Sequence, residues 1–203
     1  MTMDNRKTIT INSPPGSGNM FCQYLMRENF EMVLRWVDHQ PNLFDKNGIN
    51  ICILRNAYDT IASGVEVNFN SLNKNEKETF LKHLDTSINH SISVHLNNYN
   101  LFLDSVQKLE YVTPVGFNLL TQDPDLFLDR VAKKFDLTFK ENRIGANDVR
   151  KKMKDIENLK DRLPRNYSPL RKEIDIAVNN CDAIQAVYKR YIDIKSTIDL
   201  GIN

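Results

Sequence analysis

The chain has 203 residues, of which 41% are hydrophobic and 26% are charged, an ordinary composition for a globular protein with a sizeable core. The formal net charge is only +1, so the sequence lacks the basic surplus that general binding of DNA or RNA requires. No apolar run approaches the length of a membrane span, and the first residues lack the apolar core of a signal peptide. We therefore expect one cytoplasmic domain over residues 1–203, with neither a nucleic acid nor a membrane as partner.

The three cysteines, Cys22, Cys52 and Cys181, are isolated and have no spacing typical of a zinc site. Cys22 and Cys52 lie in apolar runs, which predicts buried free thiols and fits a reducing compartment. We expect no bound metal.

The first predicted strand is a β-branched alternating run over residues 8–12. A Pro/Gly/Ser turn follows it, and a helical pattern then covers residues 18–29. Residues 31–37 alternate polar and apolar side chains, which predicts a short strand that ends at the loop signal of residues 38–41.

Residues 49–54, INICIL, form a near-continuous apolar run, which is typical of a strand buried on both faces of a parallel sheet. A helix is predicted to begin near Asp59. The polar residues 68–78 predict an exposed loop, and two helices are expected over residues 76–88 and 90–108.

Residues 111–117 predict a further strand, and Pro114 within it indicates an edge or irregular strand. The last predicted elements are a helix over residues 125–135 capped by Asp123, a charged helix over 147–163, a loop at 166–169 and a long helix over 172–198. Strands that alternate with helices predict an α/β domain with a mostly parallel sheet and ligands at the carboxyl ends of its strands.

The turn after the first strand, PPGSGN at residues 14–19, has the composition of an anion site. Loop amides and the following helix N-terminus point at such an anion, and Ser17 and Asn19 can donate side-chain hydrogen bonds. The loop lacks the lysine of the G-x-x-x-x-G-K-[ST] loops that bind ATP or GTP. Taken alone, it is equally consistent with an ordinary strand–turn–helix connection capped by Ser17 or Asn19.

A second motif, RNAYDTIAS at residues 55–63, follows the buried strand. Arg55 stands where ligands bind to parallel sheets, and a guanidinium can hold a phosphate through two hydrogen bonds. Asp59 and Ser63 are four residues apart and share one helix face, so Ser63 could reach the same phosphate. The alternative is structural, with Arg55 paired to Asp59 and Ser63 packed.

Together the two motifs resemble those of the sulfotransferase family, approximately P-[KRG]-S-G-[TN]-[TN]-[WF] and R-N-P-x-D-x-x-x-S. The chain has PGSGNMF at residues 15–21 and RNAYDTIAS at residues 55–63. A weaker similarity covers residues 111–137, where GFNL and then Asp123-Pro124 stand in place of the family's Tyr-Glu-Asp-Leu segment and the helix that follows it. Family members transfer a sulfuryl group from 3′-phosphoadenosine 5′-phosphosulfate (PAPS) and release 3′-phosphoadenosine 5′-phosphate (PAP).

The resemblance implies a three-layer α/β sandwich with the P-loop architecture of nucleotide hydrolases. In the family the first motif holds the 5′-phosphosulfate, the second holds the 3′-phosphate, and an aromatic residue approaches the adenine. The implied cofactor-binding residues are Pro15, Gly16, Ser17, Gly18, Asn19, Met20, Arg55, Ser63 and Phe117. The acceptor would be a hydroxyl or amine of a small molecule or glycan.

The chain departs from the family pattern at several places. Gly16 replaces the lysine or arginine that stabilises charge on the bridging oxygen, as it does in some relatives with a PGSGN loop. Ala57 replaces the proline of the second motif, and Arg171-Lys172 is only a partial match to the C-terminal R-K-G-x-x-G segment.

A general base must take the proton of the acceptor, and imidazole suits neutral pH. His39 follows a short predicted strand and precedes a proline, which is the place of the family's catalytic histidine. Glu31 and Glu66 are alternatives, because some branches use a glutamate. His90 and His95 are predicted to be solvated or structural.

Two other functions remain alongside a sulfotransferase. A non-catalytic nucleotide-binding module of the same fold is favoured by Gly16 and by the incomplete C-terminal segment. A nucleotide or nucleoside kinase is disfavoured, because the loop lacks lysine and the buried strand ends in Arg55 rather than in a magnesium-binding aspartate.

Overall fold

The computed structural model describes residues 7–36, 39–155 and 170–201. Within these residues, four strands form one all-parallel sheet in the order β2-β1-β3-β4. The strands are β1 (Thr8–Asn12), β2 (Val33–Trp36), β3 (Ile49–Leu54) and β4 (Val112–Gly116). This sheet confirms the predicted α/β class, and Pro114 lies on an edge strand of the described sheet, as expected for a residue without an N–H.

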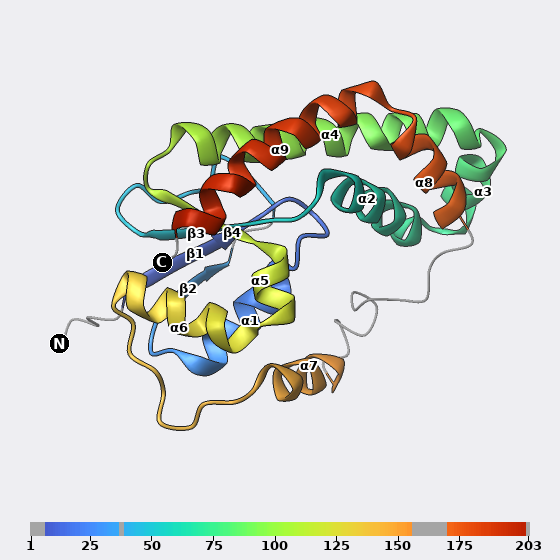
Figure 1. Ribbon diagram of the computed structural model, residues 1–203. Helices are drawn as coiled ribbons and strands as arrows, with labels where there is room; N and C mark the ends of the chain where they lie inside the picture. Colours follow the sequence, from blue (N-terminus) through green and yellow to red (C-terminus); the bar gives the residue numbers. More distant parts are fainter. Residues whose placement is uncertain (1–6, 37–38, 156–169, 202–203) are drawn as a thin grey trace.

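Helices follow β1, β3 and β4, whereas β2 leads through a loop to β3, and the helices cover the sheet (Figure 1). They are α1 (Asn19–Asn29), α2 (Ala57–Ser71), α3 (Lys74–Lys82), α4 (Leu84–Lys108), α5 (Phe117–Gln122), α6 (Pro124–Phe135), α7 (Ala146–Asp155), α8 (Arg171–Asn179) and α9 (Asp182–Gly201). In Figure 1, α4 and α9 run side by side on one side of the sheet, while α1, α5 and α6 lie on the other. Helices on both faces of a parallel sheet are compatible with a three-layer sandwich.

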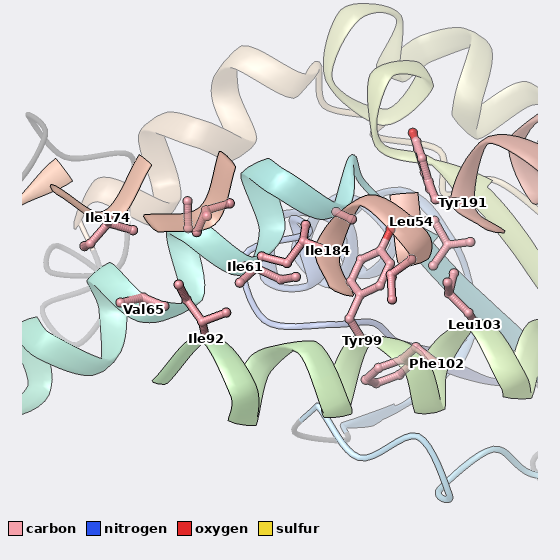
Figure 2. Close-up of a cluster of buried hydrophobic side chains, with 14 of the residues drawn as sticks. Leu54, Ile61, Val65, Ile92, Tyr99, Phe102, Leu103, Ile174, Ile184 and Tyr191 are labelled. Atoms are coloured by element: carbon pink, nitrogen blue, oxygen red, sulfur yellow. The ribbon is translucent and has the colours of Figure 1, made fainter. Parts of the chain in front are cut away.

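The apolar run of β3 explains this arrangement, because its side chains serve two hydrophobic clusters. Cys52 and Leu54 belong to one cluster, and Ile51 and Ile53 belong to the other. Figure 2 shows the first cluster, in which side chains of α2, α4, α8 and α9 meet over the sheet. A strand buried on both faces favours apolar residues at nearly every position, which is the pattern of β3. The exception is Asn50, whose buried amide donates to the carbonyl oxygens of Asp45 and Gly48.

The predicted buried thiols are confirmed, since Cys22 and Cys52 are both fully buried. Burial raises the pKa of each thiol well above its ordinary value, which keeps both in the unreactive protonated form.

None of the helices in the described ranges combines the length and the apolar character needed to cross a bilayer.

The structure differs from the predicted helices at three places. The predicted loop at 68–78 is mostly helical, because α2 continues to Ser71 and Asn73 forms a capping box with Glu76 that begins α3. The predicted helix over 172–198 is two helices that separate at Asn180 and Cys181. The short helix α5 was not predicted, and the predictions for residues 156–169 lie outside the described residues.

The sheet brings the two sequence motifs to one edge. Because β1, β3 and β4 are parallel neighbours, the segments that follow their carboxyl ends lie next to one another. These segments carry the loop of residues 14–19, Arg55 and Phe117.

Candidate functional site

The glycine loop, residues 14–19, is a tight turn with two left-handed backbone positions. A backbone hydrogen bond from Ser17 N to Pro14 O, 3.2 Å long, closes it. Gly16 has φ of 80° and Gly18 has φ of 77°, which other residues rarely adopt. A Cβ atom on Gly16 would lie 2.9 Å from the Cβ of Ser63, so α2 packs directly against the loop. A lysine at position 16 would therefore strain the backbone and require Ser63 to move.

Several buried hydroxyl groups around this loop have no hydrogen-bond partner among the described residues. They belong to Ser13, Ser17 and Thr60, whose side chains are at most 2% exposed. The buried amide oxygen of Asn19 is also unpaired within the described ranges. A buried polar group without a partner costs free energy that a ligand can recover, so this set of groups fits a bound polar molecule.

The N-terminus of α1 adds positive potential to the same place. The helix begins at Asn19 after Gly18, has no acidic residue in its first turn, and shows no side-chain cap from the described residues. Its first amide groups and its dipole are therefore directed at the glycine loop without a neutralising carboxylate. Together with the buried hydroxyl groups, this arrangement fits an anion such as a phosphate.

Arg55 connects the two sequence motifs. Its Nη1 atom donates to Gly16 O at 3.1 Å and to Ser63 Oγ at 3.4 Å, so Arg55, Ser63 and the loop meet as the sequence predicts. Its Nε atom also lies 3.8 Å from a carboxylate oxygen of Asp59. That carboxylate is half exposed, and an exposed pair at this distance is weak, so Asp59 leaves the guanidinium able to bind an anion.

Phe117, the first residue of α5, closes the other side of the loop. Its ring centre lies 4.8 Å from the guanidinium carbon of Arg55, a cation–π contact. A Cβ atom on Gly18 would lie 2.9 Å from the same ring, so the ring rests on the loop backbone. Pro15 and Met20 are half-buried at the two ends of this turn.

His39 also lies at this edge of the sheet. Its Nδ1 atom is 2.7 Å from the carbonyl oxygen of Ser13, the residue that leads into the glycine loop. A carbonyl oxygen can only accept, so Nδ1 carries the proton of the neutral ring and Nε2 carries the lone pair. That tautomer is the one a general base acting through Nε2 requires.

The two glutamates that were alternatives to His39 lie in less suitable places. Glu31 precedes β2 and therefore lies at the amino end of the parallel sheet, opposite the glycine loop. Glu66 is mostly buried and forms an ion pair with Arg171 at 3.3 Å. Arg171 also binds Asp175 at 2.8 Å, so this guanidinium joins α8 to α2 through carboxylates.

His95 is half-buried, whereas His83 and His90 are exposed. The imidazole of His95 lies against Gly64 of α2, where a Cβ atom would be 2.6 Å from its Nδ1. Burial lowers the pKa of His95, a backbone hydrogen bond with Gly64 opposes this shift, and the charge of His39 lowers the pKa further. His95 is therefore a packed residue near His39, in agreement with the structural role that was one of its two predicted alternatives.

A hollow of about 620 Å³ lies beside His39, between residues 39–42 and the C-terminal half of α4. Its wall includes Asn98, Leu101 and Ser105.

A second cation lies near the first turn of α1, where the Arg150 guanidinium carbon is 4.7 Å from the ring centre of Phe21. Sequence reasoning found neither feature, because both depend on contacts between elements far apart in the chain.

No protein-family model, curated protein or solved structure matches the chain. Within the described residues, no group of three or more histidine, cysteine or carboxylate side chains could hold a metal ion. The functional argument therefore depends on the geometry of this edge of the sheet.

Proposed function

We propose that this protein is a PAPS-dependent sulfotransferase with a P-loop-like three-layer fold. The observation that carries the proposal is the convergence of the glycine loop with Arg55 and Ser63, in which Arg55 Nη1 lies 3.1 Å from Gly16 O. This convergence combines a helix N-terminus for one anion with a guanidinium and a hydroxyl for a second. PAPS carries two anionic groups on one adenosine, which suits such a pair of subsites.

The residues present fit this donor. The amides of the glycine loop and the buried hydroxyl of Ser17 would hold the 5′-phosphosulfate, and Arg55 with Ser63 would hold the 3′-phosphate. Phe117, half-buried beside Arg55, would contact the adenine. Asn19 and Met20 contribute amide groups from the first turn of α1.

PAPS supplies the sulfuryl group and leaves as PAP, which keeps the electron pair of the broken sulfur–oxygen bond. Nε2 of His39 takes the proton of the acceptor hydroxyl or amine as that group bonds to sulfur. The loop amides stabilise the negative charge that accumulates on the sulfuryl oxygens and on the departing phosphate. Positioning and electrostatics then supply most of the rate, by analogy with phosphoryl transfer.

Arg55 could also replace the cation that the glycine loop lacks. A lysine at position 16 would be strained, because the φ there is 80° and the Cβ of Ser63 lies where a side chain would begin. Arg55, which directly follows β3, places its guanidinium against that same position. We therefore assign to Arg55 the part of the missing loop cation, as the positively charged side chain at the loop among the described residues.

A second function is favoured by one observation. Suppose that Arg55 binds only the 3′-phosphate. Because Gly16 has no side chain and Ser63 packs against it, no cation would then stabilise the bridging oxygen of the donor. That arrangement favours a nucleotide-binding module that does not catalyse transfer. A kinase is disfavoured, because the loop has no lysine and Arg55 occupies the position after β3 where an aspartate would hold magnesium.

Thermal melts test the proposal, with PAP as one ligand and ATP with magnesium as the other. PAP at 100 times its dissociation constant should stabilise the fold by about 2.7 kcal/mol, whereas ATP should give no comparable shift. A shift with ATP alone would overturn the proposal. Transfer of labelled sulfate from PAPS to a panel of hydroxyl and amine acceptors then separates an enzyme from a binding module.

A further inference from the structure

The loop of residues 39–41 is tied to two other elements at three successive carbonyl groups. Asn98 Nδ2 donates to His39 O at 3.3 Å, and Asn12 Nδ2 donates to Gln40 O at 2.5 Å. Ser105 Oγ lies 3.1 Å from Pro41 O and shares its single proton between that oxygen and Leu101 O, which is 2.9 Å away. Asn12 ends β1, and Asn98 and Ser105 belong to α4. Side chains from the sheet and from a helix thus hold a segment that has no regular structure of its own.

His39 needs such support because its backbone is unusual. Its φ is 50°, in the left-handed region that residues other than glycine seldom adopt. A residue stays in that region only when its surroundings hold it there. Asn98 binds the carbonyl group of this residue itself, whereas Asn12 and Ser105 bind the carbonyls of the next two.

The conformation of this backbone also directs the side chain. From it, the imidazole reaches Ser13 O with Nδ1 at 2.7 Å, and that contact determines which nitrogen carries the proton. Losing the hold on the carbonyl would free the backbone to relax, and the ring would then lose its acceptor. The hydrogen bond from Asn98 to the backbone of His39 would therefore also influence the tautomer of the ring.

We propose that Asn98 is a positioning residue that holds His39 with its proton on Nδ1 and its lone pair on Nε2. The functional meaning rests on the proposed role of His39 as the base, but the tautomer itself is a property of the free protein. The next residue of α4, Tyr99, donates its hydroxyl to Arg55 O at 2.5 Å. Two consecutive residues of one helix thus orient the candidate base and the candidate phosphate-binding arginine.

Nitrogen-15 NMR of the imidazole rings tests the proposal on the unliganded protein, at a pH where the histidines are neutral. The chain has four histidines, and a His39→Gln variant identifies the His39 signals. Wild type should show His39 as the Nδ1-protonated tautomer. Asn98→Ala should shift it to a mixture of tautomers, and Asn97→Ala, at the exposed neighbouring position, should leave it unchanged.

An Asn98→Leu variant repeats the test with the volume of the side chain nearly preserved, in case the alanine variant folds poorly. The proposal is wrong if His39 in wild type is protonated on Nε2, or if both Asn98 variants keep the wild-type tautomer. In sulfuryl transfer, Asn98→Ala should lower turnover by roughly 10- to 100-fold with unchanged PAP affinity, as expected for a misplaced group. A third outcome is that the NMR spectra show the expected tautomers but the protein does not bind PAP. That outcome would refute the proposed function and leave the role of Asn98 intact.

Discussion

Gly16 and His39 show how single backbone positions shape the candidate site. Both have positive φ, at 80° and 50°, and both lie at the carboxyl edge of the sheet. Gly16 lets α2 approach the loop until Ser63 touches it, and His39 turns its ring toward Ser13. The sequence predicted that both residues matter, but not that Gly16 excludes a side chain because Ser63 fills the space beside it.

Gly16→Ala tests the packing of the loop. The substitution forces alanine into the left-handed region and brings its Cβ within 2.9 Å of Ser63 Cβ. We expect the free energy of unfolding to fall by about 1–3 kcal/mol, measured by urea denaturation. Gly145→Ala is the control, because a Cβ there meets no atom within 4 Å. Equal stability of the Gly16 variant and wild type would show that α2 does not pack on the loop.

His95 should make the stability of the protein depend on pH. Burial lowers its pKa below the ordinary value of 6.5, so between the two values the unfolded chain binds more protons than the folded one. The free energy of unfolding is then fully retained above pH 6.5 and falls as the pH drops through the lowered pKa. His95→Gln should reduce this dependence, whereas His90→Gln, at an exposed position of α4, should preserve it. Identical pH profiles for the two variants would contradict the burial of His95.

His39→Ala tests the assignment of the base. Turnover of labelled sulfate should fall by about 10²–10⁴, because no group then takes the proton of the acceptor at that point. PAP affinity, measured by calorimetry, should stay near wild type. His83→Ala is the control at an exposed position. Full activity of the His39 variant would place the base elsewhere.

At the scale of elements, α4 organises the site through residues that the sequence analysis did not single out. Within its length of 25 residues it contributes Tyr99, Asn98 and Ser105, which hold Arg55, His39 and Pro41 by their carbonyl groups. It also packs on α2 and α9 in the cluster shown in Figure 2. The candidate site is therefore coupled to the core through one long helix.

Tyr99→Phe tests this coupling. The substitution keeps the buried ring and removes the hydroxyl that binds Arg55 O at 2.5 Å, which leaves that carbonyl without this donor. We expect a loss of about 1–3 kcal/mol in the free energy of unfolding. PAP binding should also weaken, because Arg55 is held less firmly. Tyr111→Phe, at a half-buried position, serves as the control, and equal effects of the two variants would argue against a specific role for Tyr99.

The elements also show what sequence patterns can predict. The apolar run of β3, the alternation of β1 and the cap at Asp123 placed these elements correctly, because each pattern is local. The polar stretch at 68–78 was misassigned because polarity was taken as a loop signal, while the Asn73–Glu76 capping box indicated a helix start. The hydrogen bonds of Asn12, Asn98 and Ser105 to residues 39–41 join segments far apart in the chain, so no local sequence pattern predicts them.

At the scale of the molecule, the parallel sheet gathers the candidate site. The carboxyl ends of β1, β3 and β4 bring the glycine loop, Arg55 and Phe117 together, as expected from the general rule for parallel sheets. This is why the convergence of the two motifs could be predicted from two short segments. The orientation of His39 and the contact between Gly16 and Ser63 could not be predicted in this way, because they depend on how α4 and α2 pack.

The most direct test of the central claim is the difference in binding free energy between PAP and adenosine 5′-phosphate, which lacks the 3′-phosphate. Calorimetry with wild type and with Arg55→Ala gives this difference in both proteins. Wild type should bind PAP more tightly, and Arg55→Ala should lose roughly 2–4 kcal/mol with PAP but far less with adenosine 5′-phosphate. Equal affinity of wild type for the two ligands, or equal losses in the variant, would contradict a 3′-phosphate subsite at Arg55.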